Sequence, residues 1–218
     1  MGGQAEVIAA VQGGDAEKLR ELIAKDPGLA SSKDDAGVSA ILHARYRMRE
    51  DLIEILLAPN PRLDICEAAA LGKNERLAEL LREDSSQVHA WSADGFTPLH
   101  LACFFGQEGA AKLLLESGAE VGAIARNTTK VMPLHSAAAS GQYAIVKMLL
   151  EGGAPVNARQ QQGYTALHSA ANRKDAATVE LLLKHGADPS LKSDDGNTAA
   201  DTAEKAGDHQ LARALRPA

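Results

Sequence analysis

The sequence predicts an all-α fold in which pairs of helices repeat along the chain and stack as a solenoid. Three observations predict it. A helix-start segment recurs every 33 to 35 residues, a Gly-Ala pair recurs in phase with it, and apolar residues at helical spacing fill the stretch between them. Aromatic residues make up only 3% of the 218 residues, so the core must consist mainly of Leu, Ala, Ile and Val, which suits closely packed helices.

The helix-start segment is clearest at 94–102, where Thr97 precedes Pro98, Leu99 and His100. Thr hydroxyls cap helices, and Pro is favoured at the first helical position because its missing N–H is not needed there. The positions equivalent to Pro98 are Pro133, Ala166 and Ala199, at steps of 35, 33 and 33 residues. The recurrence therefore predicts the first helix of each unit.

The Gly-Ala pair marks the end of the second helix of each unit. A left-handed residue after a helix is most often Gly, because Gly has no Cβ to clash. The pairs are Gly118-Ala119, Gly153-Ala154 and Gly186-Ala187. The stripes that precede them are Ala111, Leu114 and Leu115, then Val146, Leu149 and Leu150, then Val179, Leu182 and Leu183. Spacings of three and four place each stripe on one face of a helix.

These segments resemble the ankyrin-repeat family, whose 33-residue units carry the signature T-P-L-H-x-A. The match is strongest over residues 94–196, and the same phase extends toward both ends of the chain. The resemblance implies an ankyrin-repeat solenoid of about seven units, including two caps, in a single domain over 1–218. The approximate units are 1–36, 37–60, 61–93, 94–127, 128–160, 161–193 and 194–218.

Several irregularities interrupt the repeat. The segment 57–61 leads straight into the next helix, so we expect the hairpin of the second unit to be missing. About two extra residues within 126–130 should lengthen another hairpin. Met48 and Lys174 stand where other units have Gly between helices, and Met132 stands where a Thr would cap; each should cost some stability.

Composition limits the classes of partner. The net charge is −6 and no long basic run is present, which argues against a nucleic-acid partner. The two cysteines are too few for a disulfide scaffold, no signal peptide is seen at the N-terminus, and no apolar stretch is long enough to span a membrane. We therefore expect a cytoplasmic monomer whose partner is another protein.

Three histidines, His100, His135 and His168, fall in register on adjacent units. A metal-binding row is one interpretation, but packed helices lie about 8–10 Å apart, too far for the three imidazoles to share one ion. The resemblance implies a structural role instead, in which each ring hydrogen-bonds at the helix start and to the next unit. Cys66 is assigned to the same repeat position and is expected to be a small buried side chain. No nucleophile, phosphate-binding or C-x-x-C motif is present, so we expect no enzyme activity, metal or cofactor.

The aromatic residues suggest where a partner binds. The resemblance implies that variable residues of the hairpins and first helices line a concave face. Six of the seven aromatic residues of this sequence map to those positions. The predicted partner-binding residues are Tyr46, Trp91, Phe96, Phe104, Phe105, Val131, Arg159, Tyr164 and Arg173. The alternative is that Phe104 or Phe105 turns inward to fill space. Because the predicted surface runs from aromatic to basic, it would suit a partner with an apolar knob beside an acidic patch.

Three functions follow from this interpretation. The first is a protein-binding module that uses the concave hairpin and first-helix face. The alternative is an inhibitor or antitoxin-like regulator that blocks a specific enzyme with the same surface. A metal- or ligand-binding role for the histidines is the third and least favoured. The sequence does not separate the first two, because fold alone does not define function.

Overall fold

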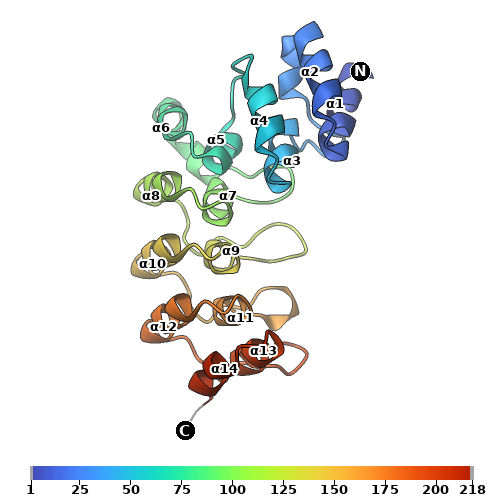
Figure 1. The fold of residues 1–218 in the computed structure, drawn as a ribbon. Helices are drawn as coiled ribbons and strands as arrows, with labels where there is room; N and C mark the ends of the chain where they lie inside the picture. Colours follow the sequence, from blue (N-terminus) through green and yellow to red (C-terminus); the bar gives the residue numbers. More distant parts are fainter. Residues whose placement is uncertain (1, 217–218) are drawn as a thin grey trace.

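A computed structural model describes residues 2–216, in which 14 α-helices form seven consecutive pairs (Figure 1). The pairs are α1 (Gly2–Gly13) and α2 (Ala16–Lys25), α3 (Ala40–Tyr46) and α4 (Glu50–Leu57), α5 (Ile65–Leu71) and α6 (Asn74–Glu83), α7 (Pro98–Phe104) and α8 (Glu108–Glu116), α9 (Pro133–Ser140) and α10 (Tyr143–Glu151), α11 (Ala166–Asn172) and α12 (Ala176–Lys184), and α13 (Ala199–Lys205) and α14 (His209–Leu215). Short 3₁₀ segments cover Pro27–Ser31, Ser85–His89 and Gln161–Gly163. The predicted all-α solenoid is confirmed.

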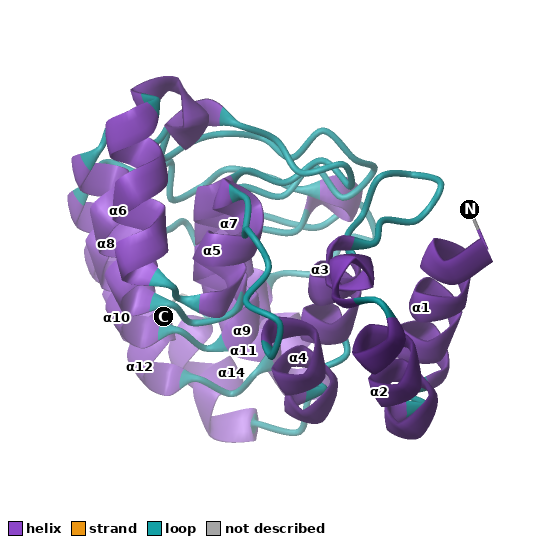
Figure 2. Ribbon diagram, turned by 90° about the horizontal axis from the view of Figure 1, so that it is seen from above, coloured by secondary structure: helices purple, strands orange, loops and turns teal. Residues whose placement is uncertain are grey.

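The helices from α5 onward form two layers. Seen along the stack, the second helices α6, α8, α10 and α12 superpose in one layer and the first helices α5, α7, α9 and α11 in the other (Figure 2). The loops that join successive pairs project from the first-helix side (Figure 1). We call the surface formed by these hairpin loops and the first helices the concave face. None of the helices within 2–216 is long and apolar enough to cross a membrane.

The helix ends follow the predicted chemistry with one exception, at Thr165. The Thr97 hydroxyl accepts a hydrogen bond from the backbone N–H of His100 at 3.3 Å and so caps α7. Met132 provides no side-chain cap for α9, as expected, and Thr165 makes no such bond for α11. Lys174, at the α11–α12 turn, has the left-handed φ of 60° that its Gly counterparts adopt elsewhere. Local sequence therefore fixes where most helices begin and end.

Both predicted loop irregularities are present. The hairpin of the fifth unit is closed by a hydrogen bond from Ala125 N–H to Val131 O at 2.8 Å, between residues six positions apart. The equivalent hydrogen bonds in two other hairpins, from Ser92 to Phe96 and from Ser193 to Asn197, join residues four positions apart. Between α4 and α5 there is no hairpin at all. The fifth hairpin is therefore two residues longer than its neighbours, as the sequence indicates.

The missing hairpin divides the core. A smaller apolar cluster joins α1 to α4, and a larger one runs from α5 to α14 with a contribution from α3. The helices α4 and α6 barely touch, whereas α2 packs on α4 and α6 on α8. Both views show α1 to α4 set to one side of the main column (Figures 1 and 2). A cavity of about 970 Å³ lies at the break, between residues 57–63 and α6.

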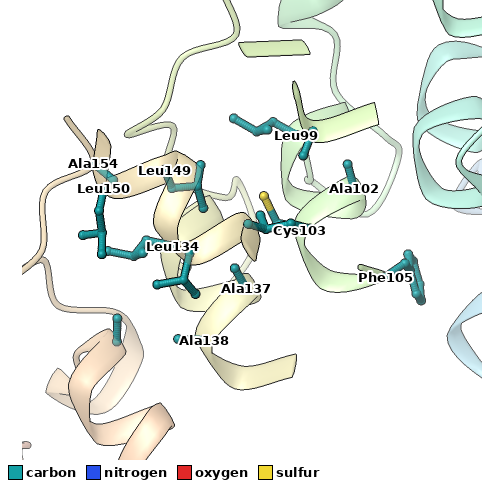
Figure 3. Close-up of a cluster of buried hydrophobic side chains, with 14 of the residues drawn as sticks. Leu99, Ala102, Cys103, Phe105, Leu134, Ala137, Ala138, Leu149, Leu150 and Ala154 are labelled. Atoms are coloured by element: carbon teal, nitrogen blue, oxygen red, sulfur yellow. The ribbon is translucent and has the colours of Figure 1, made fainter. Parts of the chain in front are cut away.

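The larger core is built from Leu and Ala, as the composition predicts. Leu99, Leu134 and Leu149 are fully buried where α7, α9 and α10 meet, and Ala102 and Ala137 belong to the same cluster (Figure 3). Each buried leucine side chain stabilises the fold by about 1.5–3 kcal/mol. The small alanines let the first helices approach closely, so this part of the stack is a rigid base for the concave face.

Candidate functional site

The three histidines tie successive units together. The backbone N–H groups of Thr97, Met132 and Thr165 donate to the respective Nδ1 atoms at 3.3, 3.0 and 3.2 Å. The Nε2 atoms donate across to the next unit: His100 to Val131 O at 3.1 Å, His135 to Ala158 O at 2.9 Å, and His168 to Asn197 O at 3.0 Å. Each imidazole thus joins its own helix start to the following hairpin.

This arrangement argues against the metal-binding interpretation. A carbonyl only accepts, so Nε2 of each ring carries the proton, and the lone pair of Nδ1 is used by the backbone N–H. Burial lowers the pKa of His100 to about 4, so this ring is neutral near pH 7. Within 2–216 no three potential ligands lie close enough together to hold a metal ion.

The assignment of Cys66 to the histidine position was wrong by one residue. Asp64 caps α5 by accepting from the backbone N–H of Glu67 at 2.9 Å, and the Glu67 carboxylate accepts from the Asp64 N–H at 2.9 Å. Glu67 therefore holds the place that His100 holds relative to Thr97. The missing hairpin removed the marker that would have set this register. Cys66 is buried, as expected. The Glu67 carboxylate, however, cannot donate a hydrogen bond to the next unit as the imidazole of His100 does.

Phe105 is only 7% exposed, so it turns inward, which is the alternative to its predicted place among the partner-binding residues. Its ring packs against Tyr46, with centroids 5.5 Å apart, and the Arg45 guanidinium lies 4.8 Å above it. Phe105 belongs to the same apolar core as the buried residues 68–70 of α5, which are all alanine. Phe104, 39% exposed, stands beside it with its ring edge-on at 5.0 Å.

Tyr46 spans the break between the two parts of the stack. Its hydroxyl donates to the Asp94 carboxylate at 2.6 Å, which links the end of α3 to the hairpin before α7. Burial and the neighbouring Asp94 carboxylate raise the pKa of Tyr46, so the hydroxyl stays a donor. The half-buried Tyr46 side chain remains accessible on the concave face.

An apolar hollow of about 210 Å³ lies on the concave face between α7 and α9. We call it the apolar hollow. It is lined by Tyr46, Phe96, His100, Leu101, Phe104, Thr129, Val131, His135, Ser136, Ala139 and Gln160. Four of these, Tyr46, Phe96, Phe104 and Val131, are predicted partner-binding residues. The hollow exists because the small Ser136 and Ala139 stand opposite the larger aromatic rings.

Trp91 lies apart from this hollow. The Arg126 guanidinium covers its ring at 4.1 Å, and Trp91 lines two other hollows, toward Cys66 and toward Glu120. Trp91 and Phe96 therefore line different hollows, although both were predicted for one partner-binding surface. Both rings lie near His100, with centroid distances of 6.4 Å for Trp91 and 6.0 Å for Phe96.

A second hollow, of about 390 Å³, lies two units further along, between α11 and α13. We call it the polar hollow. It is lined by Tyr164, His168, Ser169, Asn172, Asn197, Thr202, Lys205 and Ala206. Lys205 Nζ donates to Asn197 Oδ1 at 2.7 Å, and the Tyr164 ring is edge-on to His168. The predicted residue Tyr164 thus belongs to a hollow that the sequence did not indicate.

The two predicted arginines lie near the polar hollow. Arg173 is exposed at the end of α11 and donates to Ala139 O at 3.3 Å, which places it between the two hollows. Arg159 forms an ion pair with Asp194 at 2.9 Å, in the neighbouring hairpin. Sequence reasoning missed Ala139 and Lys205, although both occupy the repeat position of Phe104. Comparing that position across units would have shown the large Phe104 followed by the small Ala139, the neutral polar Asn172 and the charged Lys205.

Comparison with known proteins agrees with the fold. A family model described as ankyrin repeats (3 copies) matches residues 134–217, and another described as ankyrin repeats (many copies) matches residues 65–124. The chain is 28% identical over 128 residues to "Ankyrin repeat and SAM domain-containing protein 6" of Danio rerio. The aligned segment covers 55% of this chain and 17% of that protein.

Two further relatives give the same picture. The chain is 40% identical over 112 residues to "BTB/POZ domain and ankyrin repeat-containing protein NPR3" of Oryza sativa subsp. japonica (48% of this chain, 19% of that protein). It is 32% identical over 109 residues to "DNA-binding protein RFXANK" of Homo sapiens (49% and 42%). The chain spans less than half the length of each of these relatives. The repeats, the histidine ties and both family matches lead to one conclusion: the chain belongs to the ankyrin-repeat family.

Proposed function

We propose that this chain is a protein-binding module that holds its partner on the concave face, with the apolar hollow as the principal anchor site. Ankyrin repeats serve protein–protein interaction and are typically not enzymes, and the matched relatives are ankyrin-repeat proteins. The observation that carries the proposal is the apolar hollow itself. Phe96, Phe104, Val131 and Tyr46 come from three different units, yet they surround one concavity.

The physical argument rests on rigid apolar surface. Aromatic residues dominate binding energy because they bury a large area while losing few rotamers. The walls stand on packed helices and on hairpins tied by the histidines, so little ordering is required when the partner binds. The apolar lining gains most when a partner side chain displaces its water. Tyr164, Arg159 and Arg173 would form a more polar extension of the same surface.

Trp91 has a secondary place in this proposal. Because Arg126 covers its ring, a partner would meet the guanidinium as well as the indole. Because the guanidinium already covers the indole, a partner would remove less apolar surface from water at Trp91 than in the apolar hollow. We therefore move the centre of the proposed surface from Trp91 to the apolar hollow.

The decisive experiment fills the hollow. Ala139 is exposed, so Ala139→Leu should leave the core intact while occupying the hollow. A matched control is Tyr143→Ala, which removes an exposed aromatic, 45% accessible, from the second-helix layer. Affinity capture followed by mass spectrometry should lose partners with Ala139→Leu and retain them with Tyr143→Ala, at unchanged helical circular dichroism. Retention of the same partners by Ala139→Leu would refute the proposal.

The inhibitor alternative uses the same surface and is tested with the same material. A captured partner that has enzyme activity would be assayed with the wild-type chain and with Ala139→Leu. Inhibition by the wild-type chain alone would assign the regulatory role. If the activity of the captured enzyme stays unchanged at a saturating concentration of the wild-type chain, binding alone remains the proposed function.

A further inference from the structure

We infer that the bound partner contributes an extended segment with two anchors: an apolar side chain in the apolar hollow and a carboxylate in the polar hollow. This inference rests on the proposed function and specifies the partner. It predicts a linear motif, in which an apolar residue and an acidic residue are held at a fixed spacing.

The two hollows are equivalent sites on different units with different chemistry. Phe96 and His100 line the first, and Tyr164 and His168 occupy the same repeat positions in the second. At the end of the first helix, however, the first has Phe104 and the second Asn172. The two hollows therefore form at the same position in the repeat. The first is lined by apolar groups, and the second is rich in hydrogen-bonding groups.

The polar hollow favours an anion. Lys205 is the one formally charged side chain among its lining residues, because burial lowers the pKa of His168 and leaves that ring neutral. Lys205 is exposed, and its present partner is the neutral amide of Asn197 at 2.7 Å. An ammonium held by a neutral acceptor at the mouth of a hollow gains most from a carboxylate.

Nearby acidic side chains already have partners. Asp194 pairs with Arg159 at 2.9 Å, and Asp201 accepts from the Thr198 hydroxyl at 2.8 Å at the start of α13. Glu204 pairs with His209 and Arg216, on the side of α14. None of the three lines the polar hollow. Asp201, four residues before Lys205, also interacts with the Lys205 charge, so an incoming carboxylate would share Lys205 with Asp201 but would meet no acid in the lining itself.

The spacing of the two anchors follows from the stack. Successive first helices lie about 8–10 Å apart, so two units separate the hollows by roughly 16–20 Å. An extended peptide covers about 3.3 Å per residue, which gives a spacing of about five or six residues. A helical segment rises only about 1.5 Å per residue and would need about twelve. Exposed Arg173 lies between the hollows, where a further acidic residue would be favoured.

The first test is a selection. A display library of random peptides, each about 16 residues long so that anchors about twelve residues apart in a helix would also fit, would be panned on the immobilised full chain. We expect selected peptides to carry a Leu, Ile, Met or Phe and, five or six residues away, an Asp or Glu. Absence of this pairing, a spacing near twelve, or no selected peptide at all would overturn the inference.

The second test assigns the carboxylate to Lys205. Binding of one selected peptide is measured by fluorescence anisotropy. Changing the Asp or Glu of the peptide to Asn or Gln should weaken binding about tenfold, and Lys205→Gln in the chain should weaken it by about the same factor. The two changes together should weaken binding no further than either alone. The matched control Lys184→Gln, an exposed lysine at the end of α12, should have no effect. Equal binding to the wild-type chain and Lys205→Gln would overturn the inference.

The two proposals fail in different ways. Peptides that lose affinity for Ala139→Leu but not for Lys205→Gln would leave the concave face as the binding surface and remove only the acidic anchor. Capture of native partners that is insensitive to Ala139→Leu would instead refute the proposed function, whatever the peptides show.

Discussion

The regular part of the stack, α7 to α14, and the irregular part, α1 to α6, are held together by different interactions. In the regular part each histidine ties its helix start to the next hairpin, and one apolar core is continuous. In the irregular part Glu67 replaces the histidine, one hairpin is missing, and α1 to α4 form a separate core, whereas α5 and α6 belong to the larger one. Where the repeated ties are lost, individual long side chains replace them.

These replacements gather on one side of the break. Tyr46 bonds Asp94 at 2.6 Å, Arg45 Nε donates to Ala70 O at 3.1 Å, and the Tyr46 and Phe105 rings pack together. The opposite side, between α4 and α6, is left as the large cavity. The junction is thus closed next to the concave face and open behind it. Tyr46 both closes the junction and lines the apolar hollow, so the irregular part contributes to the proposed site.

The largest effect should come from truncating each core in turn. Leu52 in the smaller core and Leu114 in the larger core are both fully buried. Leu→Ala at either site should cost about 2–5 kcal/mol. Trp91, the single tryptophan, packs beside the larger core, so its fluorescence reports on that part, whereas circular dichroism reports on every helix. In urea, Leu52→Ala should lower the circular dichroism midpoint and leave the Trp91 midpoint nearly unchanged.

Leu114→Ala supplies the matched comparison, because it should lower the Trp91 midpoint. Equal shifts of both signals for Leu52→Ala would mean that the two cores unfold as one cooperative unit. That result would support the prediction of a single domain over 1–218. The division of the core into two clusters does not test this prediction.

A smaller effect should appear in acid, in the regular part. The pKa of His100 is about 4 when folded, below its ordinary value of 6.5. The unfolded chain therefore binds a proton first as the pH falls, and stability that is complete above about 6.5 is lost toward 4. At pH 5 this loss is about 2 kcal/mol from His100 alone. The pKa values of His135 and His168 are also lowered by burial and add in the same direction.

Urea unfolding followed by Trp91 at pH 7 and pH 5 measures this loss. The control His100→Gln keeps a side chain that can donate to Val131 O but does not titrate. It should lose clearly less stability between the two pH values than the wild-type chain. An identical pH dependence in the two proteins would contradict the assigned role of His100.

The sequence predicted most of the fold because repeats encode it locally. Thr97 with Pro98 starts a helix by its own chemistry, and the absent hairpin was visible as the short interval after Leu57. The site was predicted less well. The inward turn of Phe105 brings its ring against Tyr46 and Arg45, which lie far earlier in the sequence and leave no local signal around Phe105. The apolar hollow depends on Ala139 being small opposite Phe104, and a space bounded by several units has no local sequence signal.

The smallest effect compares one backbone defect in both parts. Met48 (φ 54°) and Lys174 (φ 60°) are left-handed at turns where Gly106 and Gly141 stand in other units. A left-handed conformation costs a non-glycine residue about 1–2 kcal/mol, so Met48→Gly and Lys174→Gly should each stabilise by about 1 kcal/mol, after the flexibility that Gly adds to the unfolded chain. Lys174→Gly should raise the Trp91 urea midpoint, and Met48→Gly should raise only the circular dichroism midpoint. A gain in the Trp91 midpoint from Met48→Gly would show that the junction at Tyr46 couples the two cores more strongly than their separate packing indicates.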